Sequence, residues 1–589
     1  MKKTLALILA LAMVLALAAC GSQAASTPAE AGSSAAESTA EAAATGDAAS
    51  YLSDAFIDPV GDWAKYDEMV SQIKSETDFA KRTELMHQTE DVLMSNGCVI
   101  PIYYYNDIYL QKDYVSGIYS NAFATKFFMY TKLDNGSDTL RLNLASEPAF
   151  LDPALNSSVD GACLAANSFS GLYTYNADGV CVPACAESYT VSEDGLTYTV
   201  TLKKDLKWSD GSDLTAADFE YAWKRAASET TAADYGYMFS GFDGYPNELN
   251  VTAKDDTTLE FVLTAPCAYM EDLMAFPTFF PVKQEVVESY ADWQTSPGGW
   301  CQDAGNWVSN GAYVLTGWDH DVSMTYEKNP YWYDADNVSV EKLEYMLSAD
   351  DTAIYAAYNA GDVDFIDSVP TDEIATLLAE ENPEFYIVDE LGTYYVAFNA
   401  KSSIFEGKTP EQAACMREAF SILIDRDYIC ENIGQTGQVA ANAFIPLGMA
   451  DGNGGFFKTE PVEEGYFDPY AVNDDYEGTV AKAIELLEAA GYEFDDNGML
   501  SASNPIQLEY LTNTTSGHIA IAESIQQDLA AVGIELSIAQ QDWNVFLEER
   551  KAGNFDFARE GWIADFNDPI NMLEMWTTVS GNNDCQFGR

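Results

Sequence analysis

The sequence is poor in basic residues and in histidine. Lysine and arginine number 29 against 94 aspartates and glutamates, so the formal net charge is −65, and only three histidines occur in 589 residues. Binding to nucleic acid requires a basic surface, and binding to anionic lipid requires a cluster of basic residues, so this composition argues against both. His87, His320 and His518 leave little material for a histidine-based metal site.

Aromatic residues, in contrast, are abundant. They make up 13% of the chain, and hydrophobic residues make up 47%. A disordered acidic chain would be poor in aromatics, so we expect a folded protein of two to four domains with a large core. Nine cysteines follow Cys20 without a zinc-type spacing. We expect most of them to be buried apolar residues, and an extracellular setting would also permit a few disulfides.

The N-terminus has the pattern of a secretory signal. Lys2 and Lys3 precede an apolar run, Leu5 to Leu17, which is too short to span a bilayer comfortably. Cys20 directly follows Leu-Ala-Ala, so residues 1–19 resemble a bacterial lipoprotein signal, which implies cleavage before Cys20 and lipidation of its thiol. An ordinary secretory signal is the alternative. Residues 20–50 contain no aromatic residue and are predicted to be a disordered tether.

Strands and helices alternate along the rest of the chain. Tyr198 to Leu202 alternate as a strand, and Thr215 to Asp218 form a capping box that opens a helix. Near the C-terminus, an alternating strand at 506–510, a helix ending at Gly533 and a strand at 534–538 predict a βαβ unit with parallel strands. Residues 62–105 predict two helices, the second capped by Asp78, and a strand from Val99 to Tyr105.

Several ordered motifs run through the chain. They are Ala145-Ser146-Glu147-Pro148 with Leu151-Asp152-Pro153, Ser192-Glu193-Asp194-Gly195-Leu196-Thr197-Tyr198, Lys207-Trp208-Ser209-Asp210-Gly211, Asn329-Pro330-Tyr331-Trp332, and Gly561-Trp562 with Asp565 and Asp568-Pro569. Together they resemble the peptide-binding branch of extracellular solute-binding protein family 5, the receptors of oligopeptide and dipeptide ABC importers. The resemblance implies an α/β fold with two lobes, periplasmic-binding-protein-like (type II, cluster C).

The order of the segments differs from the family's. Residues 62–134 resemble the family's C-terminal ending but precede its usual beginning, near Thr139. A circular permutation is the simplest interpretation, and a duplication remnant or a mis-joined gene is the alternative. We expect residues 62–134 to pack beside residues 392–589. The predicted layout is a signal at 1–19, a tether at 20–50, a displaced segment at 51–106 that packs into lobe 2, a lobe 1 base at 107–169 and 283–391, an additional lobe 1 domain at 170–282, and lobe 2 at 392–589.

The resemblance also implies the site. Asp565 matches the acid that binds the ligand's α-ammonium, and the backbone of Gly561 and Ile563 matches positions that pair with the peptide. The other matched positions line the same pocket: Arg559, Trp562, Trp543, Tyr235, Val159 and Tyr105. Ser157 and Ala397 replace glutamates of a well-known member, and His518 is offset from a histidine associated with the ligand's carboxylate, so the partner of that carboxylate stays open.

The function implied is a lipid-anchored receptor that binds short peptides between two hinged lobes and delivers them to the permease subunits of an ABC importer. We expect a monomer without a cofactor, a metal or a catalytic residue, and hinge crossings near Leu391-Gly392 and Tyr105-Asn106. Two alternatives remain. One is the same fold with a metal chelate, heme or sugar as ligand, and the other is an extracellular hydrolase, although the sequence contains neither a Gly-x-Ser-x-Gly elbow nor HExxH.

Overall fold

The computed structural model does not describe the whole chain. The residues it describes are 48–145, 147–462, 465–468, 470 and 476–589. The predicted signal, Cys20 and residues 20–47 of the predicted tether lie outside them. The end of that tether prediction is wrong, because Ala48–Tyr51 form a 3-10 helix (η1). Ala48 is buried there in the core that also contains Cys415.

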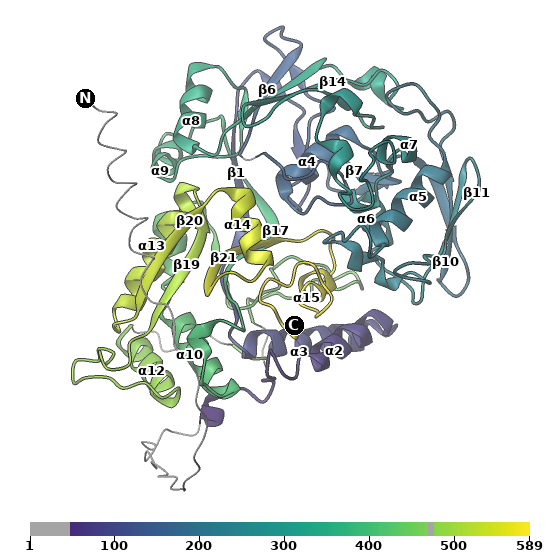
Figure 1. Cartoon of the computed structure of the whole chain (residues 1–589). Coiled ribbons are helices and arrows are strands. Elements are labelled where there is room, and N and C mark those ends of the chain that lie inside the picture. Colours follow the sequence, from purple (N-terminus) through teal and green to yellow (C-terminus); the bar gives the residue numbers. More distant parts are fainter. Residues whose placement is uncertain (1–47, 146, 463–464, 469, 471–475) are drawn as a thin grey trace, which may run out of the picture. The chain divides into compact units, whose positions relative to one another are not determined.

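A mixed sheet of 11 strands forms the centre of the described part of the chain (Figure 1). Its strands in spatial order are β13 (Tyr313–Asp319), β14 (Ser323–Lys328), β15 (Lys342–Leu347), β6 (Thr139–Leu144), β16 (Phe365–Ile366), β1 (Val99–Gln111), β17 (Phe385–Phe398), β21 (Phe557–Ile563), β19 (Gln507–Asn513) and β20 (Glu535–Gln541), and β18 (Val439–Ala440) pairs with β1. We refer to the β13-to-β16 side as lobe one and to the β21-to-β20 side as lobe two.

The long strands β1 and β17 join the two lobes. They pair antiparallel from Val99↔Ala397, in lobe two, to Leu110↔Phe385, in lobe one. Their register shifts between Tyr104 and Asn106, which lie opposite Thr393 and Asp389. A bulge of this kind locally disrupts the ladder and bends the strands. This bulge falls at the two strand crossings that are predicted to form the hinge.

Lobe one carries a second sheet. Its strands are β11 (Val251–Asp255), β12 (Thr258–Val262), β10 (Thr197–Leu202) and β9 (Ala186–Val191). The predicted strand at 198–202 is confirmed as β10. The predicted capping box is confirmed too, because Thr215 and Asp218 cap helix α5 (Ala216–Ala227), whose Phe219 and Trp223 are fully buried. The other helices of this lobe and its remaining hairpin are α4 (Val159–Ser168), α6 (Met270–Ala275), α7 (Gln284–Val287), α8 (Asp351–Ala360), α9 (Thr371–Ala379), β7 (Tyr173–Tyr175) and β8 (Cys181–Pro183).

Lobe two contains the predicted βαβ unit. Strands β19 and β20 pair parallel from Gln507↔Glu535 onward, and helix α13 (Ser516–Ala530) connects them. Gly533 follows that helix with φ +84°, a left-handed conformation that favours glycine. The other helices on this side are α10 (Pro410–Leu423), α11 (Arg426–Tyr428), α12 (Tyr476–Ala489), α14 (Trp543–Lys551) and α15 (Ile570–Glu574).

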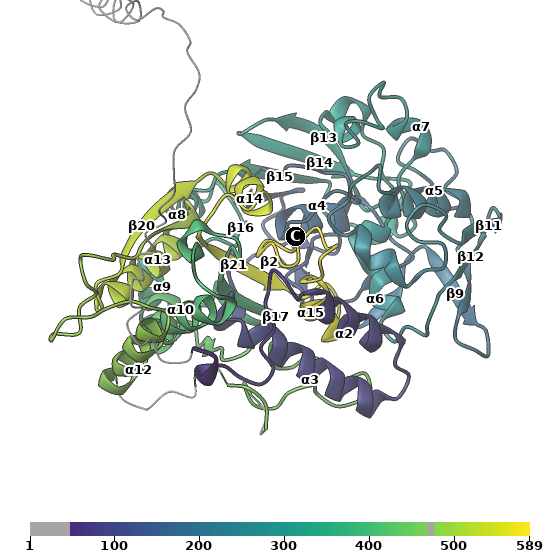
Figure 2. The same ribbon diagram turned by 60° about the horizontal axis from the view of Figure 1, so that its bottom comes forward.

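The N-terminal helices α2 (Ala64–Ser75) and α3 (Phe79–Ser95) lie against α15 and the C-terminal residues (Figures 1 and 2). The Trp63 indole donates to the carbonyl of Trp576 (2.8 Å), and the Tyr66 hydroxyl donates to that of Leu573 (2.9 Å). The guanidinium of Arg82, on α3, makes two hydrogen bonds of 2.8 Å to the carboxylate of Asp568. Asp78 caps α3, as predicted.

The prediction that residues 62–134 pack beside 392–589 is wrong for its last part. β1 continues from lobe two into lobe one and carries the following residues with it. Short strands form there: β2 (Val115–Ser116), β3 (Tyr119–Ser120), β4 (Lys126–Phe127) and β5 (Lys132–Leu133). The Tyr119 hydroxyl donates to the Tyr175 carbonyl, and the Phe128 ring contacts Tyr345, so this stretch belongs with lobe one.

Two further results concern the described residues alone. All nine of their cysteines are free, and six of the nine are buried, so the disulfides that the sequence permits do not form in this structure. No described helix combines the length and hydropathy that crossing a bilayer requires, and no described group of three or more His, Cys, Asp or Glu side chains is placed to hold a metal ion.

The Arg82–Asp568 pair provides a test of the packing between the two ends of the chain. Both side chains are buried, so we expect Arg82→Ala to lower the free energy of unfolding by about 3–5 kcal/mol, because it leaves Asp568 unpaired in the interior. Urea unfolding measures the change. Lys65→Ala is the control, because it breaks an exposed ion pair with Asp62 and should cost no more than about 1 kcal/mol. If the two variants lowered the free energy of unfolding equally, the result would contradict the packing of α3 against the C-terminal residues.

Candidate functional site

A cavity of about 210 Å³ lies between lobe one and lobe two. All nine predicted pocket residues line it: Tyr105, Val159, Tyr235, Trp543, Arg559, Gly561, Trp562, Ile563 and Asp565. A cavity of this size far exceeds the roughly 10–15 Å³ needed to admit one water molecule, so it has room for several waters or for a small ligand. The structure therefore brings together side chains that are as far apart in sequence as Tyr105 and Asp565.

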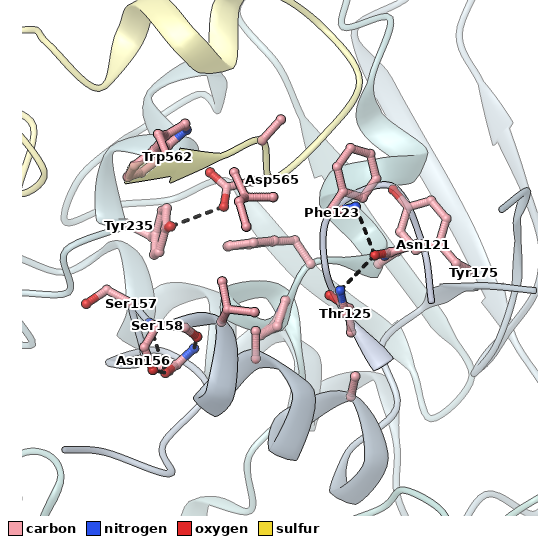
Figure 3. Close-up of a pocket in the computed structure, with 18 of the residues that line it drawn as sticks. Asn121, Phe123, Thr125, Asn156, Ser157, Ser158, Tyr175, Tyr235, Trp562 and Asp565 are labelled. Carbon is pink, nitrogen blue, oxygen red and sulfur yellow. Dashed lines mark hydrogen bonds between the residues drawn. The ribbon is translucent and has the colours of Figure 1, made fainter. Parts of the chain in front are cut away.

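Asp565 follows β21 and is held by neutral donors. Its Oδ1 accepts a hydrogen bond from the Tyr235 hydroxyl (3.1 Å), and its Oδ2 accepts one from Nδ2 of Asn571 (2.8 Å). Asn571 lies on α15, and its Oδ1 accepts from the Asp565 backbone N–H (3.0 Å) and from the Trp562 indole (3.1 Å). Figure 3 shows the Asp565 carboxylate directed into the space beside Tyr235. No Lys, Arg or His pairs with Asp565 among the described residues.

The enclosure of Asp565 changes its titration. Burial raises the pKa of its carboxyl to about 7, and the nearby Glu574 carboxylate adds to the rise, while the hydrogen bonds from Asn571 and Tyr235 oppose it. A positive charge placed beside this carboxylate would lower that pKa again, because it would favour the ionised form. The site is therefore suited to bind a cation such as an ammonium group.

Strand β21 offers an open backbone edge beside Asp565. On one side it pairs with β17 along its whole length, from Phe398↔Phe557 to Gly392↔Ile563. On the other side it pairs with β19 only at Phe557 and Ala558. Within the described part of the chain, residues 559–563 therefore have no strand partner on that second side. An extended ligand could add there as a strand.

Gly561 lies in the middle of this open edge for a steric reason. A β-carbon at this position would collide with the hydroxyl of Tyr105, which approaches from β1. Glycine lets the tyrosine ring lie directly on the strand. The N-terminal segment of the chain thus supplies one wall of the cavity at the strand edge.

Arg559 lies six positions before Asp565 at the other end of the open edge. Its side chain is 8% exposed, and its guanidinium carbon lies 5.5 Å from the ring centre of Tyr394 and 5.6 Å from that of Trp543. Its Nε lacks a hydrogen-bond acceptor, and no described carboxylate is within ion-pair distance of it. Arg550 differs, because it binds both Glu560 (2.6 Å) and Asp584 (3.2 Å).

Lobe one closes the cavity opposite β21. Val159 begins helix α4, which Ser158 caps, and Tyr235 precedes the 3-10 helix η2 (Gly236–Gly241). The Lys551 ammonium of lobe two binds the Asp234 carboxylate and donates to the Ser157 hydroxyl (2.9 Å). Together with the bond between Tyr235 and Asp565, these contacts connect the two lobes across the cavity.

The positions that depart from the family's pattern have different places. Ser157 lines the cavity, whereas Ala397 is fully buried in β17 and does not. His518 also lies outside the lining, with its ring 5.5 Å from that of Tyr394. Burial and the charge of Arg559 lower the pKa of His518 well below its usual value, so it is neutral at physiological pH.

Sequence reasoning missed Asn571, which orients both Asp565 and Trp562. Its place two residues after Pro569 of the Asp568-Pro569 motif, on the first turn of α15, was the available signal. The aromatic residues of the 119–130 stretch were also missed, because the aromatic content of the chain is high throughout and gives no local contrast.

Comparison with known proteins agrees with this architecture. Residues 181–584 match the family described as bacterial extracellular solute-binding proteins, family 5 middle. The oligopeptide-binding protein OppA of Bacillus subtilis is 31% identical over 77% of this chain and 80% of its own, and the dipeptide-binding protein DppE of the same species is 32% identical over 76% and 78%. The structure of the Escherichia coli murein tripeptide binding protein MppA covers 76% of this chain and 84% of its own, with a TM-score of 0.68 and 29% identity. The predicted two-lobed, periplasmic-binding-protein-like α/β fold is confirmed, and the chain belongs to the bacterial extracellular solute-binding proteins of family 5.

Proposed function

We propose that this protein is a receptor that binds short peptides between its lobes and delivers them to an ABC importer. The observation that carries the proposal is Asp565, a carboxylate that is enclosed in the cavity, held by two neutral donors and placed at the end of an open strand edge. Every unmodified peptide carries an α-ammonium group and a backbone that can pair as a strand. Binding through these shared features does not depend on side-chain identity.

Arg559 is the proposed partner of the peptide's carboxylate. A buried guanidinium without an acidic partner can bind a carboxylate without breaking another ion pair. Its planar set of N–H donors also matches the two oxygens of a carboxylate. Arg559 and Asp565 are six positions apart along one extended segment, a span of at most about 20 Å. A peptide held at both ends would therefore have no more than about six residues.

The cellular setting is part of the proposal. The N-terminal pattern of Lys2, the apolar run and Cys20 supports an extracytoplasmic protein held at the cell membrane by lipid on Cys20. The named oligopeptide- and dipeptide-binding relatives support peptide ligands. We further propose that the protein acts as a monomer, that its membrane and ATPase partners are separate chains, and that its segment order reflects a circular permutation.

The acidic residues of the cavity favour binding over catalysis. Glu560 and Asp584 both bond to Arg550, and Asp565 is bonded to Tyr235 and Asn571. A glycoside hydrolase requires two carboxyls that face each other across the bond to be cleaved. These three side chains are instead engaged with neighbouring protein groups, so we do not propose a hydrolase.

The first test removes the carboxylate. We expect Asp565→Asn to weaken binding of tri-alanine at least about a hundredfold, because the ligand's ammonium would be enclosed without a counter-charge. Isothermal titration calorimetry at pH 7.5 measures the affinity, and the peptide-induced rise of the thermal midpoint provides a second readout. Asp496→Asn, an exposed carboxylate outside the cavity, is the control. An unchanged affinity in Asp565→Asn would rule out the proposed role.

The second test uses pH. Without a ligand, the Asp565 carboxyl has a pKa of about 7, and a bound ammonium group would lower that pKa. Below pH 7, the carboxyl must therefore release its proton when the peptide binds. We expect the affinity to fall as pH decreases from 7, by up to about tenfold per unit. Above about pH 8 the affinity should fall again, because the peptide's own amine loses its proton. Calorimetry from pH 5 to pH 9 measures this profile, and the acidic decrease should be absent in Asp565→Asn.

The third test concerns Arg559. Wild-type protein should bind tri-alanine about tenfold to a hundredfold more tightly than tri-alanine amide, because only the acid can form the ion pair. In Arg559→Met the two ligands should bind equally. Lys203→Met, on a lysine outside the cavity lining, serves as the control and should retain the preference. A preference that survives in Arg559→Met would assign the carboxylate to another partner.

A further inference from the structure

The cavity has two chemically different sides. Its charged lining residues all come from lobe two: Arg550, Lys551, Arg559, Glu560, Asp565 and Asp584. Among the described residues from 105 to 395 that line it, none is Asp, Glu, Lys or Arg. The lobe one side instead presents uncharged groups. They include polar side chains such as Asn121, Thr125 and Thr174, and a set of rings that we call the apolar chamber, formed by Tyr119, Phe123, Phe127, Tyr175, Phe276 and Trp332. Figure 3 shows Phe123 and Tyr175 across the space from Trp562.

The polar atoms of these rings are already used by the protein. The Tyr119 hydroxyl donates to the Tyr175 carbonyl (3.2 Å), and the Tyr175 hydroxyl donates to Oδ1 of Asp272 (2.9 Å). The Trp332 indole donates to the Ser170 hydroxyl (3.0 Å). A ligand group in the chamber therefore meets ring faces and edges. A charged group there would lose its hydration without gaining a counter-charge from the described lining of lobe one, which is costly.

The loop that carries Phe123 has a fixed conformation. Oδ1 of Asn121 accepts hydrogen bonds from the backbone N–H groups of Phe123 (3.1 Å) and Thr125 (3.0 Å), and both bonds are drawn in Figure 3. Ala124, between them, has φ +58°, an uncommon conformation for a residue with a side chain. The turn thus places the Phe123 ring in one position at the chamber wall.

The chamber lies at the ammonium end of the proposed peptide site. The N–H of Ala564, next to Asp565, donates to the Leu391 carbonyl (2.7 Å), and the N–H of Leu391 donates to the carbonyl of Ala122 (2.9 Å), next to Phe123. From the other side, the Phe276 ring contacts Tyr235, which bonds Asp565, at a centroid distance of 5.0 Å. The chamber is thus connected to Asp565 on one side through Leu391 and on the other side through Tyr235.

We propose that the apolar chamber receives the side chain of the peptide's first residue and selects peptides that begin with a large apolar residue. The proposal rests on the proposed peptide-binding function. In the first residue of a peptide, the same α-carbon bears the ammonium group and the side chain. A peptide whose ammonium group binds Asp565 therefore places that side chain next to the chamber. Aromatic rings favour apolar and aromatic partners, and the chamber offers no counter-charge to Lys or Asp.

The experiment compares tripeptides X-Ala-Ala, with X as Ala, Phe, Lys or Asp, by isothermal titration calorimetry. Phe-Ala-Ala should bind about tenfold to a hundredfold more tightly than tri-alanine, since burial of a phenyl ring has that magnitude. Lys-Ala-Ala and Asp-Ala-Ala should bind no more tightly than tri-alanine, and Ala-Ala-Phe should gain far less than Phe-Ala-Ala. Equal affinities for Phe-Ala-Ala and tri-alanine would overturn the proposal.

Two variants connect the preference to the chamber. Phe123→Asp should remove the advantage of Phe-Ala-Ala and make Lys-Ala-Ala the preferred peptide, while Phe456→Asp, an exposed phenylalanine outside the cavity, should change nothing. Ala166→Leu, on α4, narrows the cavity and should weaken Phe-Ala-Ala more than tri-alanine. A preference retained in both Phe123→Asp and Ala166→Leu would also overturn the proposal.

The failures of the two proposals are distinguishable. If the binding of tri-alanine depends on Asp565 while all X-Ala-Ala peptides bind with the same affinity, the receptor function stands and the selectivity of the chamber is refuted. If tri-alanine and Phe-Ala-Ala both bind independently of Asp565, the proposed site itself is refuted.

Discussion

The cavity between the lobes is organised around an enclosed carboxylate, Asp565, that no cation among the described residues neutralises. Asp565 receives hydrogen bonds from Tyr235 and Asn571 but forms no ion pair with any residue that the structure describes, and its pKa of about 7 reflects the cost of enclosing its charge. Elsewhere in the same cavity, acidic groups are paired, as Glu560 and Asp584 are with Arg550. A buried charge without a partner is unfavourable. The proposed peptide-binding function accounts for this carboxylate, because the ligand's ammonium would supply the missing charge.

The support of this carboxylate comes from both ends of the chain. Asn571 is positioned by α15, and α15 is covered by the N-terminal helices α2 and α3 through Tyr66 and Arg82. The same N-terminal segment continues into β1 and places Tyr105 on Gly561. A displacement of α2 and α3 would thus act on the site without touching a ligand. The geometry inside the cavity therefore depends on the packing of α2 and α3 against α15, outside the cavity.

The sequence predicted the elements with strong local signals and the site residues with a family motif. The βαβ unit near 506–538, the cap at Asp78 and nine of the residues that line the cavity followed from these signals. It could not predict Asn571, whose role exists only because α15 turns back onto Asp565. For residues 115–134 it gave two conflicting predictions, lobe one from the layout and packing beside 392–589 from the resemblance to the family's ending. The continuation of β1 into lobe one, through pairing with β17 hundreds of residues away, agrees with the first.

The net charge of −65 raises the question of how a peptide carboxylate enters such a protein. At physiological ionic strength, charges separated by more than about 8 Å are largely screened, so most of the acidic surface is not felt inside the cavity. Enclosed groups are screened much less, and there the described lining contains two unlike, unpaired charges, Asp565 and Arg559. A peptide in its zwitterionic form matches both in sign. Under the proposed function, selection depends on these two enclosed side chains, one on β21 and the other two residues after it, and the surface charge contributes mainly to solubility.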